Sequence, residues 1–203
     1  IERAAAAAAQ MLVVHHGLFW DGQSPRIGRL ERRRLETLFA ADISLVAYHL
    51  PLDGHPVLGN NALLCALLGI EPHAPFAPYR GIELGRHGTL AAPEAPADLA
   101  ARLGAALGST PLVFPGGPAE ARRIGVISGA GGREIRSAAA LGLDVLVTGE
   151  PEEDLPYLAR ELGVTAIAAG HYATETVGVR GLGDLLAARF GVEHVWLPVD
   201  NPV

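Results

Sequence analysis

The chain has 203 residues, of which 49% are hydrophobic and 19% charged, with a formal net charge of −6 at pH 7. This composition excludes a disordered chain and predicts one sizeable domain or two smaller ones sharing a core. The acidic balance argues against nucleic-acid binding, which depends on clustered Lys and Arg, and no apolar stretch approaches the roughly 20 residues of a membrane helix.

The first residues and the cysteine content indicate where in the cell the protein is located. The alanine run at 4–9 lacks the basic start of a signal peptide, so we interpret it as part of a helix. The chain begins at Ile1 rather than at a methionine, and we therefore expect a further segment before it. Cys65 is the single cysteine and has leucine neighbours, which predicts a buried thiol in a cytoplasmic protein.

The predicted elements alternate along the chain. Apolar residues at helical spacing, as at Leu35, Leu38 and Phe39, predict helices, and short apolar runs predict strands. The expected helices are 2–10, 30–41, 62–68, 98–107, 133–141, 152–162 and 176–190. The expected strands are 11–14, 43–48, 81–90, 112–114, 123–127, 145–148, 165–169 and 195–197. This alternation predicts an α/β fold with a mixed sheet, in which Asn60 and Asn61 cap a helix and 91–96 is a linker.

The first candidate site is His15-His16, directly after the strand at 11–14. Successive side chains of a strand point to opposite faces, so both imidazoles face one cavity only if the strand ends there and the chain turns, as Gly17 allows. Alternatively, the two histidines serve two adjacent metal ions. A third interpretation makes one a hydrogen-bonded core residue and the other a surface residue.

A second pair, His171 and Glu175, follows Gly170 at the end of a strand. In a helix, residues four apart share a face, and an imidazole with a carboxylate suits Zn²⁺, Mn²⁺ or Fe²⁺. The alternative is a hydrogen-bonded pair on a helix surface.

Asp53 stands just beyond the strand at 43–48, where its carboxylate could bridge two cations. The alternative is an Asx turn at this Asp-Gly sequence. His49 lies nearby and could donate a hydrogen bond to a metal ligand or act as an acid or base. We favour it as the residue that moves protons, and we expect His55 to be on the surface.

Two glycine-containing turns follow later strands. The turn at 128–132 could hold a phosphate, but it lacks the known nucleotide-binding spacings, and we favour close packing of a helix on a strand. Glu150, in Thr148-Gly149-Glu150, is a candidate catalytic carboxylate, a residue behind a metal ligand, or an acidic start to a helix.

These motifs in this order resemble the Nif-three-like family, also called GTP cyclohydrolase I type 2 homologues or dinuclear metal centre proteins. The resemblance rests on Val-Val-His15-His16-Gly-Leu-Phe-Trp, His49-Leu-Pro-Leu-Asp53, Thr-Gly-Glu150 and Gly-His171-Tyr-x-Thr-Glu175, and it covers nearly the whole chain.

The resemblance implies two intertwined α/β units, here 1–92 with 166–203 and 93–165, in a ring-shaped homohexamer. It also implies two divalent transition-metal ions, zinc, iron or manganese. The ligands it carries over are His15, His16, Asp53, His171 and Glu175.

From this resemblance we expect a metal-dependent hydrolase that acts on a nucleotide or another phosphoester, with His49 and Glu150 as candidate catalytic residues. The alternative is a regulatory or adaptor ring without turnover, which binds protein partners. An arginine-rich surface at 26–34 could contact an acidic partner, or it could be an ordinary solvated helix face.

Overall fold

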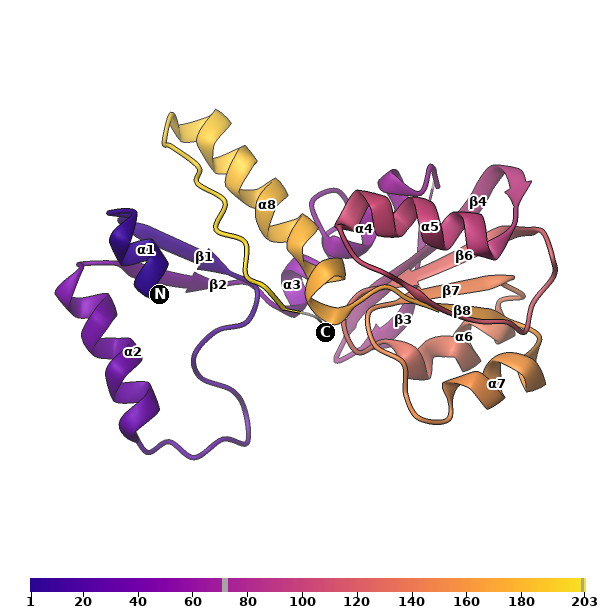
Figure 1. Cartoon of the computed structure of the whole chain (residues 1–203), viewed down its shortest axis with the longest axis horizontal. Coiled ribbons are helices and arrows are strands. Elements are labelled where there is room, and N and C mark those ends of the chain that lie inside the picture. Colours follow the sequence, from indigo (N-terminus) through magenta and orange to yellow (C-terminus); the bar gives the residue numbers. More distant parts are fainter. Residues whose placement is uncertain (71–72, 202) are drawn as a thin grey trace. The chain divides into compact units, whose positions relative to one another are not determined.

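The computed structural model describes residues 1–70, 73–201 and 203 and contains two compact units (Figure 1). Unit 1 comprises Ile1–His49 and Val179–Val199, and unit 2 comprises Leu50–Gly178 and Asp200–Val203. These bounds are not those of the two units expected from the sequence.

Unit 1 has a two-stranded parallel sheet, with Met11 beside Ser44 and Val14 beside Ala47. Its small core is centred on Ala4, Leu38 and Ile43. The first helix ends at Ala6, earlier than expected, while the first strand has its expected bounds. The elements of unit 1 are α1 (Glu2–Ala6), β1 (Met11–Val14), α2 (Arg29–Ala40), β2 (Ser44–Ala47) and the later part of α8 (His171–Phe190).

Unit 2 is built on a six-stranded mixed sheet of order β3-β4-β6-β7-β8-β5, which confirms the expected fold class. The three central strands β6, β7 and β8 are parallel, and the other pairs are antiparallel. Its strands are β3 (His73–Tyr79), β4 (Ile82–Glu94), β5 (Leu112–Phe114), β6 (Ala121–Ile127), β7 (Val145–Thr148) and β8 (Thr165–Ala168).

Helices cover both faces of this sheet, α4 and α5 on one side and α6 and α7 on the other (Figure 1). Every residue of β7 and β8 is therefore buried, as is usual for parallel strands between helical layers. Val145 and Val147 face one core and Leu146 the other. The helices of unit 2 are α3 (Leu50–Asp53), α4 (Asn60–Leu67), α5 (Pro96–Leu107), η1 (Gly132–Glu134), α6 (Ile135–Ala140), α7 (Leu155–Leu162) and the start of α8.

In the sheet of unit 2 one expectation is wrong and one strand was missed. The segment 91–96 is not a linker, because β4 continues to Glu94 and Pro96 occupies the first turn of α5, where proline is favoured. The strand β3 was not predicted, because Pro75 and Pro78 argue against a strand. It lies at the sheet edge, where a missing N–H is tolerated.

The expected strand at 195–197 is also wrong, since residues 191–201 contain no strand. Side-chain contacts hold this segment to α8 instead. His194 Nδ1 lies 2.8 Å from the Asp184 carboxylate, and the Arg180 guanidinium lies 5.6 Å from the Trp196 ring centre. Among the helices that the structure describes, none has the length and apolar character needed to cross a membrane.

Candidate metal centre

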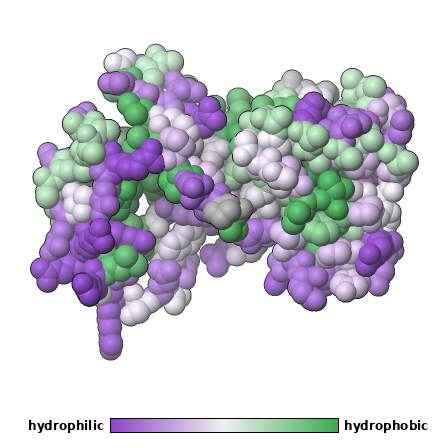
Figure 2. Space-filling model, viewed as in Figure 1, coloured by the Kyte–Doolittle hydropathy of each residue, from purple (hydrophilic) through white to green (hydrophobic). Residues whose placement is uncertain are grey.

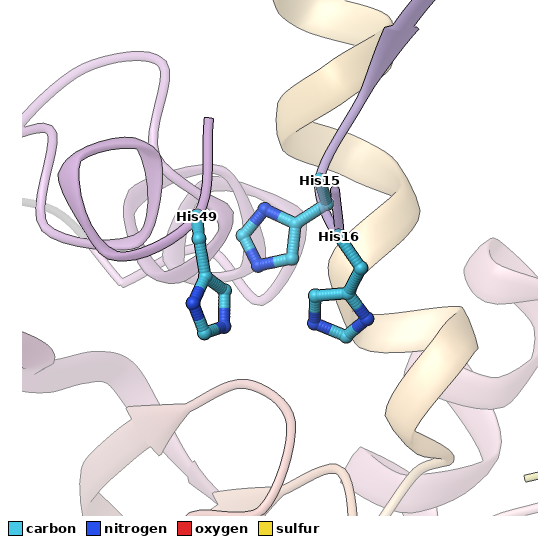
Figure 3. Close-up of side chains that lie close together, drawn as sticks. All are labelled: His15, His16 and His49. Atoms are coloured by element: carbon cyan, nitrogen blue, oxygen red, sulfur yellow. The ribbon is translucent and has the colours of Figure 1, made fainter. Parts of the chain in front are cut away.

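The histidines that follow the two strands of unit 1 lie in one cluster. His15 and His16 come directly after β1 and His49 comes shortly after β2, and the parallel pairing brings the carboxyl ends of both strands to the same edge. The ring centres lie 4.9 Å apart for His15 and His16 and 5.0 Å from each of these to His49. Figure 3 shows the three rings gathered together, two of them extending from the end of one strand.

This geometry fits the first interpretation of His15-His16, in which the strand ends before the two histidines and both imidazole rings face the same cavity. β1 ends at Val14, so the alternation of a strand does not extend to the histidines. Gly17 follows, where a Cβ atom would lie 3.1 Å from the Ala47 Cβ. The glycine therefore lets the chain pass close to β2 as it turns.

The three histidines have the chemistry of a metal site. One ring nitrogen of each lies within 4.8 Å of those of the other two, and neutral imidazoles are common ligands of zinc, iron and other transition metals. Sequence reasoning assigned His49 to proton transfer or to donating a hydrogen bond to a ligand, and did not include it among the candidate ligands. The signal was present, because His49, like His15, directly follows an apolar run of strand residues.

Trp20 lies against this cluster. Its ring centre is 5.1 Å from His16 and 5.0 Å from His49, both in edge-on arrangements. The indole N–H donates to the Gly17 carbonyl at 3.1 Å, which fixes the ring, and the residue remains 38% exposed. The fluorescence of Trp20 should therefore respond to changes in the histidine cluster.

In unit 2, Asp53 belongs to a buried hydrogen-bond network. Its Oδ1 atom accepts bonds from the Asn60 amide at 2.8 Å and the Ser128 hydroxyl at 3.2 Å. The Asn61 Oδ1 atom accepts the Ser128 backbone N–H at 2.7 Å. The expectation that the asparagines cap α4 is wrong, because the preceding glycine is the N-cap and both side chains serve this network. The network fixes the carboxylate and its loop.

The chain after Asp53 forms a turn closed by the backbone, since the His55 N–H donates to the Leu52 carbonyl at 3.2 Å. The Nδ1 atom of His55 accepts the N–H groups of Val57 and Leu58 at 3.2 and 2.9 Å. The side chain is exposed, which confirms the expectation for His55.

His171 and Glu175 lie one turn apart at the start of α8, which begins at His171 itself, five residues before the expected start. His171 Nε2 is 3.1 Å from Glu175 Oε2, and His171 Nδ1 is 2.6 Å from Glu150 Oε1. Metal-binding histidines typically use their second nitrogen on a carboxylate in this way. The position of Glu150 suits a residue that orients His171, and its catalytic role stays a prediction.

The turn after β6 joins these two parts of unit 2. Ser128 contacts Asp53, and a Cβ atom on the next residue, Gly129, would collide with the Glu175 carboxylate and lie 3.2 Å from His171 Nε2. Gly149 packs against the same turn, because a Cβ atom added to it would lie 2.6 Å from the Gly129 carbonyl oxygen. This agrees with the close-packing interpretation of the glycine-rich turn.

The carboxylates next to His171 favour its protonated, positively charged form. The hydrogen bond with Glu175 is the main cause that raises the pKa of His171 to about 9. The charges of Glu175 and Glu150 raise the pKa further, and burial of the ring lowers it. A raised pKa means that the imidazolium stabilises the fold fully below its ordinary value of 6.5 and that this contribution is lost as the pH rises through about 9.

We therefore expect chelator-treated His171→Gln protein to have a lower Tm than wild type at pH values below 6.5, with a difference that shrinks above 9. Thermal unfolding followed by circular dichroism across this range measures it. A Tm difference that is constant with pH would contradict a charged His171.

The fold and the two groups of side chains define an α/β protein with histidine and carboxylate clusters suited to transition metals. The chain belongs to the Duf34/NIF3 (NGG1p interacting factor 3) family, whose model matches residues 1–202. This confirms the resemblance identified from the sequence motifs.

Individual relatives match the whole chain. It is 44% identical to the GTP cyclohydrolase 1 type 2 homolog of Pseudomonas aeruginosa over 202 residues, 100% of this chain and 80% of that protein. The solved structure of protein ybgI, described as of unknown function, matches with a TM-score of 0.92 and 40% identity over 100% of this chain and 80% of that one. A structure from Thermus thermophilus matches with a TM-score of 0.89 and 37% identity, over 100% of this chain and 79% of that one.

Proposed function

We propose that this protein binds two divalent transition-metal ions, zinc, iron or manganese, and uses them as a hydrolase of a nucleotide or another phosphoester. The proposed ligands are His15, His16, Asp53, His171 and Glu175. Their assignment to one pair of ions comes from the sequence resemblance. The observation that carries metal binding is the histidine cluster of unit 1, in which three ligand atoms lie within 4.8 Å of one another.

The donor sets fit this proposal. In unit 1 the donors are imidazoles, and in unit 2 an imidazole lies beside carboxylates. Imidazole and carboxylate groups are both suitable ligands for zinc, iron and manganese. Bound ions of this kind supply Lewis-acid chemistry, which acidifies water and polarises a phosphoryl or carbonyl group.

The chain's own residues have separate tasks in this proposal. Glu150 fixes the orientation of His171 through the Nδ1 atom. Asn60 and Ser128 hold the Asp53 carboxylate in place through Oδ1. His49, which lies beside His15 and His16, either completes the ligand set in unit 1 or receives a proton from the attacking water.

The fluorescence of Trp20 tests where the metal binds. The chain has two tryptophans, so Trp196→Phe leaves Trp20 as the only indole. Because Trp20 contacts His16 and His49, added Co²⁺ or Ni²⁺ should quench its emission.

The matched variants make this test specific. Replacing His15, His16 and His49 together by Gln in the Trp196→Phe background should abolish saturable quenching, and His55→Gln, at an exposed histidine, should preserve it. Equal quenching with the cluster removed would place the metal elsewhere and contradict the proposal.

The alternative, an adaptor ring without turnover, is favoured by one surface. Arginine side chains lie exposed on α2, and Figure 2 shows hydrophilic residues gathered over this helix. Two of them are engaged by carboxylates, Arg32 with Glu36 at 2.7 Å and Arg33 with Glu2 at 2.5 Å. Such exposed ion pairs contribute little to stability, so the arginines can exchange these carboxylates for carboxylates of a partner protein.

Assembly and location are also part of the proposal. We propose a homohexamer in the cytoplasm, the first from the family resemblance and the second from the single cysteine, Cys65, which is fully buried. Light scattering on the purified full chain measures the assembly, and a monomer at micromolar concentration would contradict it.

A further inference from the structure

A groove of about 600 Å³ lies on unit 2 along the strands β3, β4 and β6, apart from the residues assigned to metal binding. Four basic side chains line it, together with the hydroxyl of a threonine. No carboxylate is among the lining residues that the structure describes. Its volume lies in the range of pockets that hold small organic molecules, about 300–1,000 Å³. The polar lining residues are His73, His87, Thr89, Arg122 and Arg123.

The strand register places three of these side chains together. Thr89 pairs with Arg123 across β4 and β6, and His87 is two residues before Thr89 on β4. Residues two apart on a strand, and residues directly opposite across strands, share one face of a sheet. His87, Thr89 and Arg123 therefore share a face. Consistent with this, burial and then the positive charge of Arg123 lower the pKa of His87.

Both arginines are held in place by hydrogen bonds that use only part of their donors. Arg123 Nη2 donates to the Leu141 carbonyl at 2.7 Å, and Arg122 Nε donates to the Leu90 carbonyl at 3.3 Å. Their backbone N–H groups both donate to the Asp144 carboxylate at 2.8 Å. A guanidinium has five N–H donors, so each arginine keeps several for a ligand while its position is fixed.

We propose that this groove binds the phosphate group of a small phosphorylated molecule, with Arg123 as the main anion-binding group and Thr89 and His87, which share its face of the sheet, as further donors. Guanidinium groups suit phosphate because parallel N–H groups match two of its oxygens. The exposed apolar lining residues, such as Ala74 and Ala91, would contact the rest of the molecule.

Calorimetric titration of the chelator-treated full chain with inorganic pyrophosphate, and separately with inorganic phosphate, tests the site without bound metal. Arg123→Gln should weaken pyrophosphate binding about tenfold or more, as expected for loss of a charged hydrogen-bond donor. Because this variant also loses the bond to Leu141, Thr89→Val provides a second test that leaves the arginines in place and should weaken binding more modestly.

Two controls identify the site. Arg133→Gln removes an exposed arginine outside the groove, paired with Glu152 at 3.1 Å, and should leave the affinity unchanged. Asp53→Asn, in the candidate metal centre, should also leave it unchanged. Equal weakening in Arg133→Gln and Arg123→Gln would indicate a nonspecific charge effect, and no measurable binding of either anion to wild type would overturn the proposal.

Discussion

Gly129→Ala is expected to weaken metal binding by about tenfold to a hundredfold, the range seen when residues that support metal ligands are changed. Gly129 has a φ of +63°, and a Cβ atom there would collide with Glu175 Oε1 and approach His171 Nε2 at 3.2 Å. The added methyl group must therefore displace the carboxylate of a proposed ligand. Competition with a chromogenic chelator measures the change in affinity.

A matched glycine separates this effect from backbone strain. Gly163 has a similar φ of +70°, but among the described residues no heavy atom other than those of its chain neighbours lies within 4 Å of its Cβ position. Both alanine variants should lose about 1–2 kcal/mol of stability from the left-handed conformation. Only Gly129→Ala should lose metal affinity. Equal metal affinity in the two variants would contradict the assignment of Glu175 as a ligand.

Asp53→Asn is expected to abolish turnover while the fold is retained. The isosteric amide keeps an oxygen that can accept from Asn60 and Ser128, but it removes the negative charge. Asp53→Ala would instead leave these buried donors without their acceptor, at a cost of about 1–3 kcal/mol. The measurement is turnover of a panel of nucleotides and phosphoesters by the metal-loaded protein.

Asp42→Asn is the control for Asp53→Asn, because Asp42 is exposed and its φ of +52° suits asparagine. It should retain full activity. If metal-loaded wild type turns over none of the panel, the adaptor function is favoured over the hydrolase. If Asp53→Asn retains both metal and turnover, Asp53 is not a ligand.

The α/β class and most elements could be predicted because local signals sufficed. The strands 11–14, 112–114 and 145–148 have their expected bounds, since each is a short apolar run between turn residues. The failures depend on tertiary context. The prolines within β3 are tolerated only because that strand lies at an edge of the sheet.

The glycines of β4 show the same limit. Gly85 and Gly88 lie inside β4, although glycine is unfavourable within strands, and β4 runs unbroken from Ile82 to Glu94, beyond the expected end at residue 90. Gly85 lies against the ring of Phe76 on the neighbouring strand, where a side chain would collide. No local pattern contains that contact, because the strand that carries Phe76 was itself not predicted.

The sequence pointed to candidate site residues but not to the hydrogen-bond network around them. The apolar strand followed by histidine pointed to His15 and His171, and the helical spacing of Glu175 was confirmed. The sequence did not reveal that Asn60 supports Asp53 or that Glu150 contacts His171, since these contacts join residues brought together only by the fold.

The metal content of the purified full chain tests the central claim most directly. Elemental analysis after purification, and again after chelation and reconstitution with zinc, iron or manganese, should find up to about two ions per chain. The content should fall when His15, His16 and His49 are replaced by Gln and remain unchanged in His55→Gln. Protein that binds no transition metal even after reconstitution would contradict the account.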